Sequence, residues 1–417
     1  MKALLTVIIV IIFSVPALAE DTEIRLKALE EAVKKQQAVL DNMVPERSAP
    51  GHGEKAAMSA PKISLVLDTA FYSSKFNDAE LEARQLPGFN TAAFDKSNGF
   101  DAVAELFIFA PVDPYFRLHT TIPIGVDGAE LEEAYFATTA LPFGLGVKGG
   151  RFKSGFGLMN KMHPHEWAFA DAPLVYSAFL GSEGLIENGA SLVYEPGLPF
   201  HAELGIEALE GDNEVLFGSG ARSGAHAYAA YMRAFFGITD TVTLRIGASG
   251  AKGDTLTESA AKGFELAGDS RLYAAELSLG WERSHEHGLI MEAEYFYRVQ
   301  DGELTDTTLL TSSVLERRQD GFYAQAVYRL GRWAWAVRYD KLAVGKDEYL
   351  LDGISNDFGR APRRISGALE IHPSDASRIR LQYGHDLSAR DNRVNREFFL
   401  QFVMMIGEHG GHHKETH

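Results

Sequence analysis

The chain has 417 residues, which is enough for one large β structure or for two ordinary domains. It carries 40 basic and 57 acidic residues, and the net charge of −17 argues against nucleic acid as a partner. No cysteine is present, so the chain has neither disulfide bonds nor thiolate chemistry. Hydrophobic residues make up 46% and the mean hydropathy is −0.12, which argues against a helical membrane protein.

Residues 1–19 have the features of a secretory signal peptide. Lys2 supplies the positive start, Leu4 to Phe13 form a short apolar core, and Ala17-Leu18-Ala19 offers small residues for cleavage. The alternative is a retained membrane anchor. The shortness of the apolar stretch and the cleavage site favour removal of the segment, so we expect the mature chain to begin after it.

Residues 21–44 are predicted to form a short helix that Pro45 ends. Its apolar positions recur at alternating spacings of three and four, which is typical of a coiled-coil seam. We expect this coil to associate the chain into a trimer or dimer. An isolated helix of this length is marginal in water, so a fraying amphipathic segment is the alternative. Residues 45–61 contain proline, glycine and small residues and are predicted to be a linker.

From residue 62 onward the pattern changes to a period of two, which predicts β-strands with one apolar and one mixed face. In the first segment, Ile63, Leu65 and Leu67 alternate with Ser64 and Asp68. We expect about sixteen such strands. They lie near 63–72, 101–108, 114–124, 129–140, 145–155, 187–196, 200–211, 224–237, 240–252, 270–284, 288–300, 319–330, 332–342, 363–373, 376–387 and 397–406.

The connections between these strands alternate between tight and long. The tight ones are 111–113, 141–144, 196–199, 237–240, 285–287, 330–332 and 373–375. The long ones are 73–98, 156–185, 212–223, 253–269, 301–318 and 343–362, with two shorter members at 125–128 and 388–392. This alternation predicts an all-β, antiparallel, up-and-down transmembrane barrel over 62–407, closed because lipid cannot satisfy open sheet edges. The tight turns would face the periplasm, and a His-rich tail, 408–417, would follow the barrel.

A barrel of about sixteen strands is too wide for wall side chains alone to fill, so the lumen is predicted to be an aqueous channel. Charges of both signs in the lumen would favour polar solutes, and an acidic excess predicts a mild cation preference. The alternative is that these charges are solvated without conferring selectivity. The strand phases place more acidic than basic residues on the lumen face: Asp68, Asp101, Glu105, Glu203, Glu207, Glu276, Glu292, Glu294, Glu370 and Glu397, against Arg117, Arg245, Arg338, Arg378 and Arg380. The residues predicted to line the pore are Glu105, Arg117, Arg151, Lys153, Arg245, Glu276, Glu292, Glu294, Arg338, Arg378 and Arg380.

The long connection 156–185 is unusually apolar for an exposed loop. Because exposed apolar loops must pack against something, we expect it to fold into the barrel and narrow the channel. The alternative is packing on the rim or at a subunit contact. The residues predicted to form the constriction with the wall are His163, His165, Glu166, Trp167 and Asp171.

Two histidines of this connection raise the question of a metal. His163 and His165 lie near Glu166 and Asp171 in sequence, and imidazole with carboxylate suits Zn²⁺. Against this, His-Pro-His has no defined ligand geometry, and His-rich tails are often solvated. No cofactor is therefore required, with zinc at His163 and His165 as the alternative. The sequence has no nucleophilic triad and no Gly-x-Ser-x-Gly, so we do not expect an enzyme.

The signal, the strand count and the long third outer connection resemble those of Gram-negative outer-membrane porins. The preceding coil is similar to that of porins with a periplasmic N-terminal coil, including the phosphate-selective O and P type. The resemblance implies a homotrimer in contact with outer-membrane lipid, with the coil in the periplasm. The O and P type uses lumen lysines and arginines for anions, and the acidic lining here departs from that pattern.

A second resemblance is local. The segments Ala110–Phe116, Gly150–Phe152 and His163–Trp167 resemble short outer-membrane proteins labelled zinc-regulated TonB-dependent receptors. Receptors of that class have about 22 strands and a plug, whereas only about forty residues separate signal and barrel here. We therefore expect passive diffusion of small polar solutes or ions. A ligand-specific receptor for zinc uptake is the alternative, and an occluded structural or adhesion barrel is a third hypothesis.

Overall fold

A computed structural model of the chain describes residues 60–83, 85–86, 88–89, 91–92, 97–218, 224–259, 264–284 and 286–407. The predicted signal peptide, the coil, the linker up to residue 59 and the His-rich tail lie outside the described residues. Within the described part, no helix is long and apolar enough to cross a membrane.

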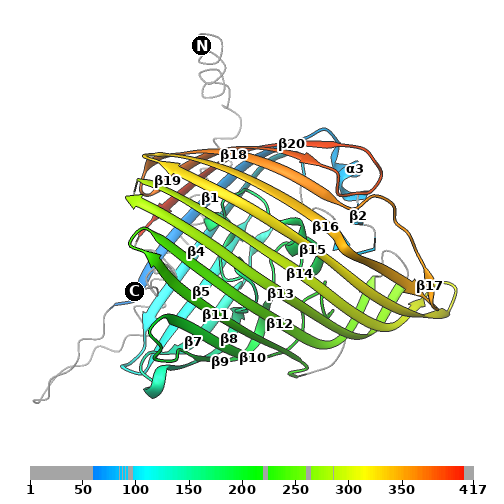
Figure 1. Cartoon of the computed structure of the whole chain (residues 1–417), viewed down its shortest axis with the longest axis horizontal. Helices are drawn as coiled ribbons and strands as arrows, with labels where there is room; N and C mark the ends of the chain where they lie inside the picture. The colour runs from blue at the N-terminus through cyan, green and yellow to red at the C-terminus, as the bar shows by residue number, and fades with distance from the viewer. Residues whose placement is uncertain are drawn as a thin grey trace, which may run out of the picture. The chain divides into compact units, whose positions relative to one another are not determined.

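Sixteen long strands of the described chain form one closed antiparallel barrel, which confirms the predicted fold (Figure 1). Each strand pairs with the next, and β1 closes the ring by pairing with β20 from Leu65 opposite Ile406 to Ser74 opposite Glu397. The strands are β1 Lys62–Ser74, β4 Gly99–Pro111, β5 Phe116–Gly125, β7 Glu133–Thr138, β8 Leu145–Lys153, β9 Ile186–Tyr194, β10 His201–Leu209, β11 Ala227–Thr239, β12 Val242–Ser259, β13 Phe264–Ser284, β14 His287–Asp306, β15 Thr311–Leu330, β16 Trp333–Leu351, β18 Arg363–Ser374, β19 Ser377–Asp386 and β20 Asn395–Ile406.

The remaining described elements are short. Two-residue strands extend the barrel sheet at the tips of connections, and another pair forms a separate small hairpin. These are β6 Gly128–Ala129, β17 Ile354–Ser355, β2 Gln85–Leu86 and β3 Thr91–Ala92. The helical pieces are α3 Asp78–Ala83, α4 Leu174–Phe179 and the 3-10 turns η1 Pro142–Gly144 and η2 Pro164–Glu166.

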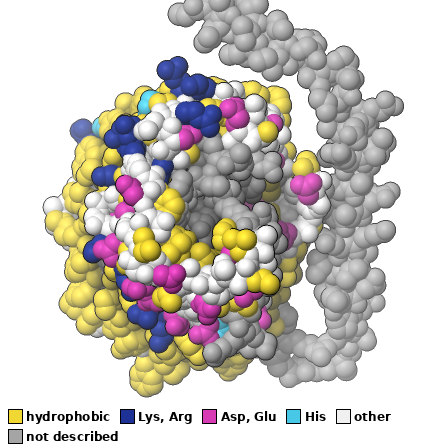
Figure 2. Space-filling view, turned by 90° about the vertical axis from the view of Figure 1, so that its right-hand side faces the viewer, with side chains coloured by type: hydrophobic (Ala, Val, Ile, Leu, Met, Phe, Trp, Pro, Cys, Tyr) yellow, Lys and Arg dark blue, Asp and Glu magenta, His cyan; other side chains and the backbone are white. Residues whose placement is uncertain are grey.

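The two faces of the barrel wall differ in chemistry. Along β11, Tyr231 and Arg233 are buried on the inside while Tyr228 and Met232 are exposed on the outside. Hydrophobic side chains gather on the outer flank of the barrel, and charged ones are frequent on the rim (Figure 2). This arrangement follows from the period of two, because one face of each strand meets lipid and the other meets the lumen.

One tight connection shows why its residues are needed. In η1, Phe143 and Gly144 both have a left-handed backbone, with φ of 64° and 71°. A Cβ on Gly144 would lie 2.1 Å from the carbonyl oxygen of Glu195 in the connection between β9 and β10, so only glycine fits.

The predicted bounds of three long connections are wrong. Much of 253–269, 301–318 and 343–362 continues the strands, so β12 to β16 stand taller than their neighbours. The alternation persists with polar residues on the inner face, as where the Thr255 hydroxyl donates to the Ser270 hydroxyl at 2.7 Å. The sequence pattern did not predict these extensions because polar residues occur on both of their faces. Without apolar alternation, a strand has the composition of a loop.

Candidate functional site: the inward segment and the barrel wall

Residues 154–185, between β8 and β9, are called the inward segment here, and they contain the connection predicted at 156–185. The segment leaves β8 by bonding to inner-face residues of other strands. Ser154 Oγ and the amide of Gly155 donate to the carboxylate of Glu207 on β10, at 2.5 and 3.0 Å. The amide of Leu158 donates to Glu294 on β14 at 2.6 Å. Its backbone thus lies against the inside of the barrel.

Arg233 on β11 fixes this first stretch. Its Nε lies 2.9 Å from Glu276 on β13, two strands away, and its Nη1 lies 3.2 Å from Glu203 on the adjacent β10. Its Nη2 donates to the carbonyls of Gly155 and Gly157, the latter at 2.6 Å. One buried guanidinium therefore joins two wall carboxylates to the backbone of the inward segment.

Asp171 fastens the segment to another part of the wall. Its carboxylate lies 2.8 Å from Arg338 Nη2 on β16 and 2.6 Å from Arg364 Nη1 on β18. Gln382 on β19 donates to the same carboxylate at 2.7 Å. Asp340 completes the group, since it accepts the Nε–H of both arginines and the amide of Leu174. All the charges in this group are buried and paired.

Between these two fastenings, β19 holds the middle of the segment by its carbonyls. Arg378 donates to the carbonyl of His165, and Arg380 donates to that of Trp167 at 2.6 Å. In return, the amide of Ala170 donates to Gln382 at 2.7 Å. The backbone of the inward segment is therefore supported by polar contacts from strands all round the barrel.

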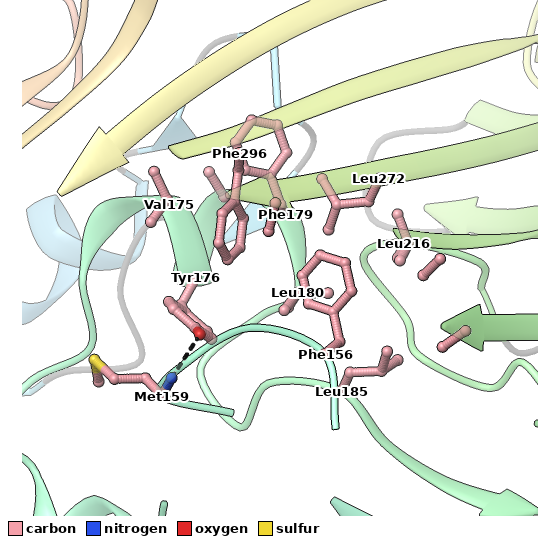
Figure 3. Packing of buried hydrophobic residues seen from close by; sticks show 14 of the residues in the cluster. Phe156, Met159, Val175, Tyr176, Phe179, Leu180, Leu185, Leu216, Leu272 and Phe296 are labelled. Atoms are coloured by element: carbon pink, nitrogen blue, oxygen red, sulfur yellow. Dashed lines mark hydrogen bonds between the residues drawn. The ribbon is translucent and has the colours of Figure 1, made fainter. Parts of the chain in front are cut away.

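The apolar residues of the segment pack against the wall inside the barrel. Phe156 and Phe179, both fully buried, lie with ring centroids 5.5 and 6.1 Å from Phe296 on β14 (Figure 3). Tyr176 of α4 joins the same cluster and accepts a hydrogen bond from the amide of Met159 at 3.0 Å (Figure 3). This packing explains why so long a connection is so apolar.

A compact group of carboxylates surrounds the His-Pro-His motif. His163 Nδ1 lies 3.2 Å from Glu132 Oε2, and its Nε2 lies 3.2 Å from Glu133 Oε2. The ring of His165 is stacked on that of His163, and its Nδ1 contacts Glu105 on β4. Burial disfavours the charged imidazolium, but hydrogen bonds with Glu132 and Glu133 outweigh it and raise the pKa of His163 to about 10.

Most of the predicted lining residues lie on the inner face. The inward segment covers Glu105, Glu276, Glu294, Arg338 and Arg380, each at most 6% exposed. The side chains of Arg245, Glu292 and Arg378 keep 29%, 19% and 15% of their surface. Arg117, opposite Pro111 and Ala137, is also on the inner face and half-buried. Lys153, at the end of β8, lies 2.7 Å from Glu132.

The prediction for Arg151 is wrong. Its register partners are Ala134 and Asn188, which belong to the outward rows of β7 and β9. Its Nε donates to the carbonyl of Leu131 on the rim at 3.2 Å. Lys148, which does face inward, is three residues away, and residues three apart on a strand point to opposite faces.

The predicted constriction residues serve mainly to fasten the segment. His163, His165 and Asp171 are buried against the wall. Trp167 contributes its carbonyl, and Glu166 closes the η2 turn by accepting the amide of His163 at 2.9 Å. His163, His165 and Asp171 therefore direct their side chains to the wall, whereas Glu166 turns back onto its own segment.

Several contact residues were not singled out by sequence reasoning. Strand phase does assign the inner face to Arg233, Asp340, Arg364 and Glu133, because each follows the alternation of its strand. Glu132 lies just before β7, so the alternation of a strand does not assign a direction to its side chain. The partners of these groups in the inward segment lie far away in sequence.

One protein is similar to this chain in sequence, and several solved structures are similar to it in fold. No family model matches the chain. An uncharacterized protein of Aquifex aeolicus is 36% identical over 378 residues, which cover 84% of this chain and 79% of that protein. In-vitro folded OmpT, an outer membrane protein of Vibrio cholerae, has a TM-score of 0.51 at 10% identity over 85% of this chain and all of its own.

Two further solved structures have the same TM-score of 0.51 and 12% identity. They are an anion-selective porin from Comamonas acidovorans, covering 83% of this chain and 99% of its own, and the outer membrane channel DcaP of Acinetobacter baumannii, covering 86% and 100%. At these identities the matches establish the fold, which is the barrel of the outer-membrane porins.

Proposed function

Because this chain belongs to the same family as the uncharacterized Aquifex aeolicus protein and has the fold of outer-membrane porins, we propose that it is a channel of the outer membrane. It passes small polar solutes or ions by diffusion, and the inward segment narrows it. The apolar outer flank meets lipid, the predicted coil lies in the periplasm, and the chain assembles as a homotrimer.

The observation that carries this proposal is the fastening of the inward segment across the inner wall. Its polar contacts reach β10, β12 and β14 at its start and β16, β18 and β19 further on. A barrel this wide is not filled by wall side chains, so a segment held inside it reduces the cross-section for solutes.

Charged side chains that keep some exposure give the remaining space its polarity. Lys161 of the inward segment lies 2.8 Å from Glu203, and Arg245 lies 3.9 Å from Glu292. All four are only partly buried. Partly exposed charges of both signs favour polar over apolar solutes, as the proposal requires.

The first prediction concerns the conductance of the full chain in a planar lipid bilayer. We expect discrete, ohmic conductance steps that need no energy source, because a passive channel offers a standing water path. Membranes given heat-denatured protein provide the control. A folded preparation that never conducts would contradict the channel and favour an occluded barrel or a gated receptor.

The second prediction concerns ion selectivity, measured as the reversal potential across a KCl gradient. We expect a mild cation preference in the wild type, from the excess of acidic lining residues. Glu292→Gln removes a partly exposed negative charge and should weaken that preference, whereas Arg245→Gln should strengthen it. Both shifts should shrink at high salt, because counter-ions screen exposed charges. Identical reversal potentials in all three proteins would show that these charges are only solvated.

A second candidate function is a ligand-specific receptor that takes up zinc. The buried group of Glu105, Glu132 and His163 favours it, since these residues combine imidazole with carboxylates. This receptor differs from a channel in having no standing conductance. Zinc entry into protein-containing vesicles that admit no other small cation would favour the receptor over the channel.

A further inference from the structure

Three donor groups from separate parts of the chain meet where the inward segment touches the wall. They are Glu105 of β4, Glu132 before β7, and His163 of the inward segment. One ligand atom from each lies within 4.8 Å of the other two. We propose that these three residues bind one divalent transition-metal cation, of the Zn²⁺ or Mn²⁺ class, which fastens the inward segment to the barrel wall.

The donor set fits such an ion. One imidazole nitrogen and carboxylate oxygens are ligands for Zn²⁺ and Mn²⁺. Glu132 Oε2 lies on the side of His163, while Glu132 Oε1 lies 2.7 Å from Lys153 Nζ. Glu132 can therefore bind an ion through Oε2 and keep its ion pair with Lys153. Glu105 Oε1 lies 3.9 Å from the same His163 nitrogen, Nδ1.

The surroundings of His163 supply the second, independent argument. Its other ring nitrogen, Nε2, lies 3.2 Å from Glu133. Metal-binding histidines typically direct the remote nitrogen to a carboxylate, which fixes the tautomer and the ring. Glu133 is itself held by the amide of Lys153 at 2.8 Å. The imidazole is thus oriented as a ligand whose Nδ1 points to Glu105 and Glu132.

The charge of the group also calls for a cation. Three buried or nearly buried carboxylates, those of Glu105, Glu132 and Glu133, lie round the imidazole of His163, and Glu132 also contacts the ammonium of Lys153. In the metal-free group the proton on His163 offsets part of this negative charge, and, despite burial, hydrogen bonds with Glu132 and Glu133 raise the pKa of His163 to about 10. A metal-bound imidazole is neutral, so a divalent ion would displace that proton and supply the compensating positive charge in its place.

The local structure already holds His163 at this position without an ion. Glu166 accepts the amide of His163 and Pro164 occupies the first position of the η2 turn, so the turn sets His163 at the wall. Phe107 of β4 packs its ring edge-on against the rings of His163 and His165 at 5.1 and 5.6 Å. An ion here joins β4, the residues before β7 and the inward segment in one site.

The test measures metal bound by the full chain with alanine at His409, His412, His413 and His417, so that the tail cannot bind. After chelation and equilibrium dialysis against ZnCl₂, we expect one ion per chain by elemental analysis. Glu105→Gln and His163→Asn should each lower zinc affinity at least about 10-fold, in the range seen for disrupted metal sites. The matched controls are His201→Asn and Glu316→Gln, at exposed positions, which should leave it unchanged.

No bound zinc in the tail-substituted chain, or binding that survives both site variants, would overturn the proposal. If a variant fails to fold, pulsed electron paramagnetic resonance of Mn²⁺ in the tail-substituted chain decides instead. Coupling to one directly bound imidazole nitrogen supports the site, and its absence refutes it. The metal site and the proposed channel are tested separately. A barrel that conducts ions but binds no zinc would refute the metal site and leave the channel unaffected.

Discussion

Replacing Asp171 with alanine is expected to raise the single-channel conductance and to make it noisier. The Asp171 carboxylate holds Arg338 and Arg364 at 2.8 and 2.6 Å, so its loss releases the inward segment from β16 and β18. The arginines keep Asp340 as a partner, but the wall loses one negative charge. We therefore also expect the reversal potential to move towards anion preference.

Two further variants make the interpretation specific. Asp375→Ala removes a carboxylate at an exposed tight connection and should leave conductance and selectivity unchanged. The double variant Asp171→Ala/Arg364→Ala restores the net charge of the wild type, so it should keep the raised conductance and lose the anion shift. An Asp171→Ala channel identical to wild type would show that the inward segment does not limit the current.

The architecture of the barrel was predictable because its signal is local. A period of two identifies a strand and its inner face within a few residues, and alternating connection lengths order the strands round a ring. The same locality explains the errors. The tall ends of β12 to β16 lack apolar alternation, and the lining prediction put Arg151 on the inner face although its register partners belong to the outward rows of β7 and β9.

The contacts of the inward segment were not predictable in the same way. The sequence places Glu166 and Asp171 beside His163, but η2 turns Glu166 back onto the amide of His163. Asp171 lies against β16 and β18 instead. The carboxylates that do surround His163 come from β4 and from around the start of β7, and only the closed barrel brings them together.

Replacing Arg233 with methionine is expected to destabilise the barrel by about 3–5 kcal/mol, the cost of breaking a buried ion pair from one side. The variant leaves Glu276 and Glu203 without this partner and removes the donor to the carbonyls of Gly155 and Gly157. The measurement is reversible urea unfolding in lipid vesicles. Arg271→Met, on the exposed outer face of β13, is the control and should cost much less.

The companion variants separate charge from shape. Arg233→Lys keeps a positive charge but lacks the guanidinium fork, so it should recover only part of the loss. Arg233→Met/Glu276→Gln should be more stable than Arg233→Met alone, because it no longer buries an uncompensated carboxylate. Equal stability of Arg233→Met and Arg271→Met would mean that Arg233 does not fasten the inward segment. If Arg233→Met lowers the free energy of unfolding and Arg271→Met does not, the contacts between the wall and the inward segment contribute to the stability of the barrel.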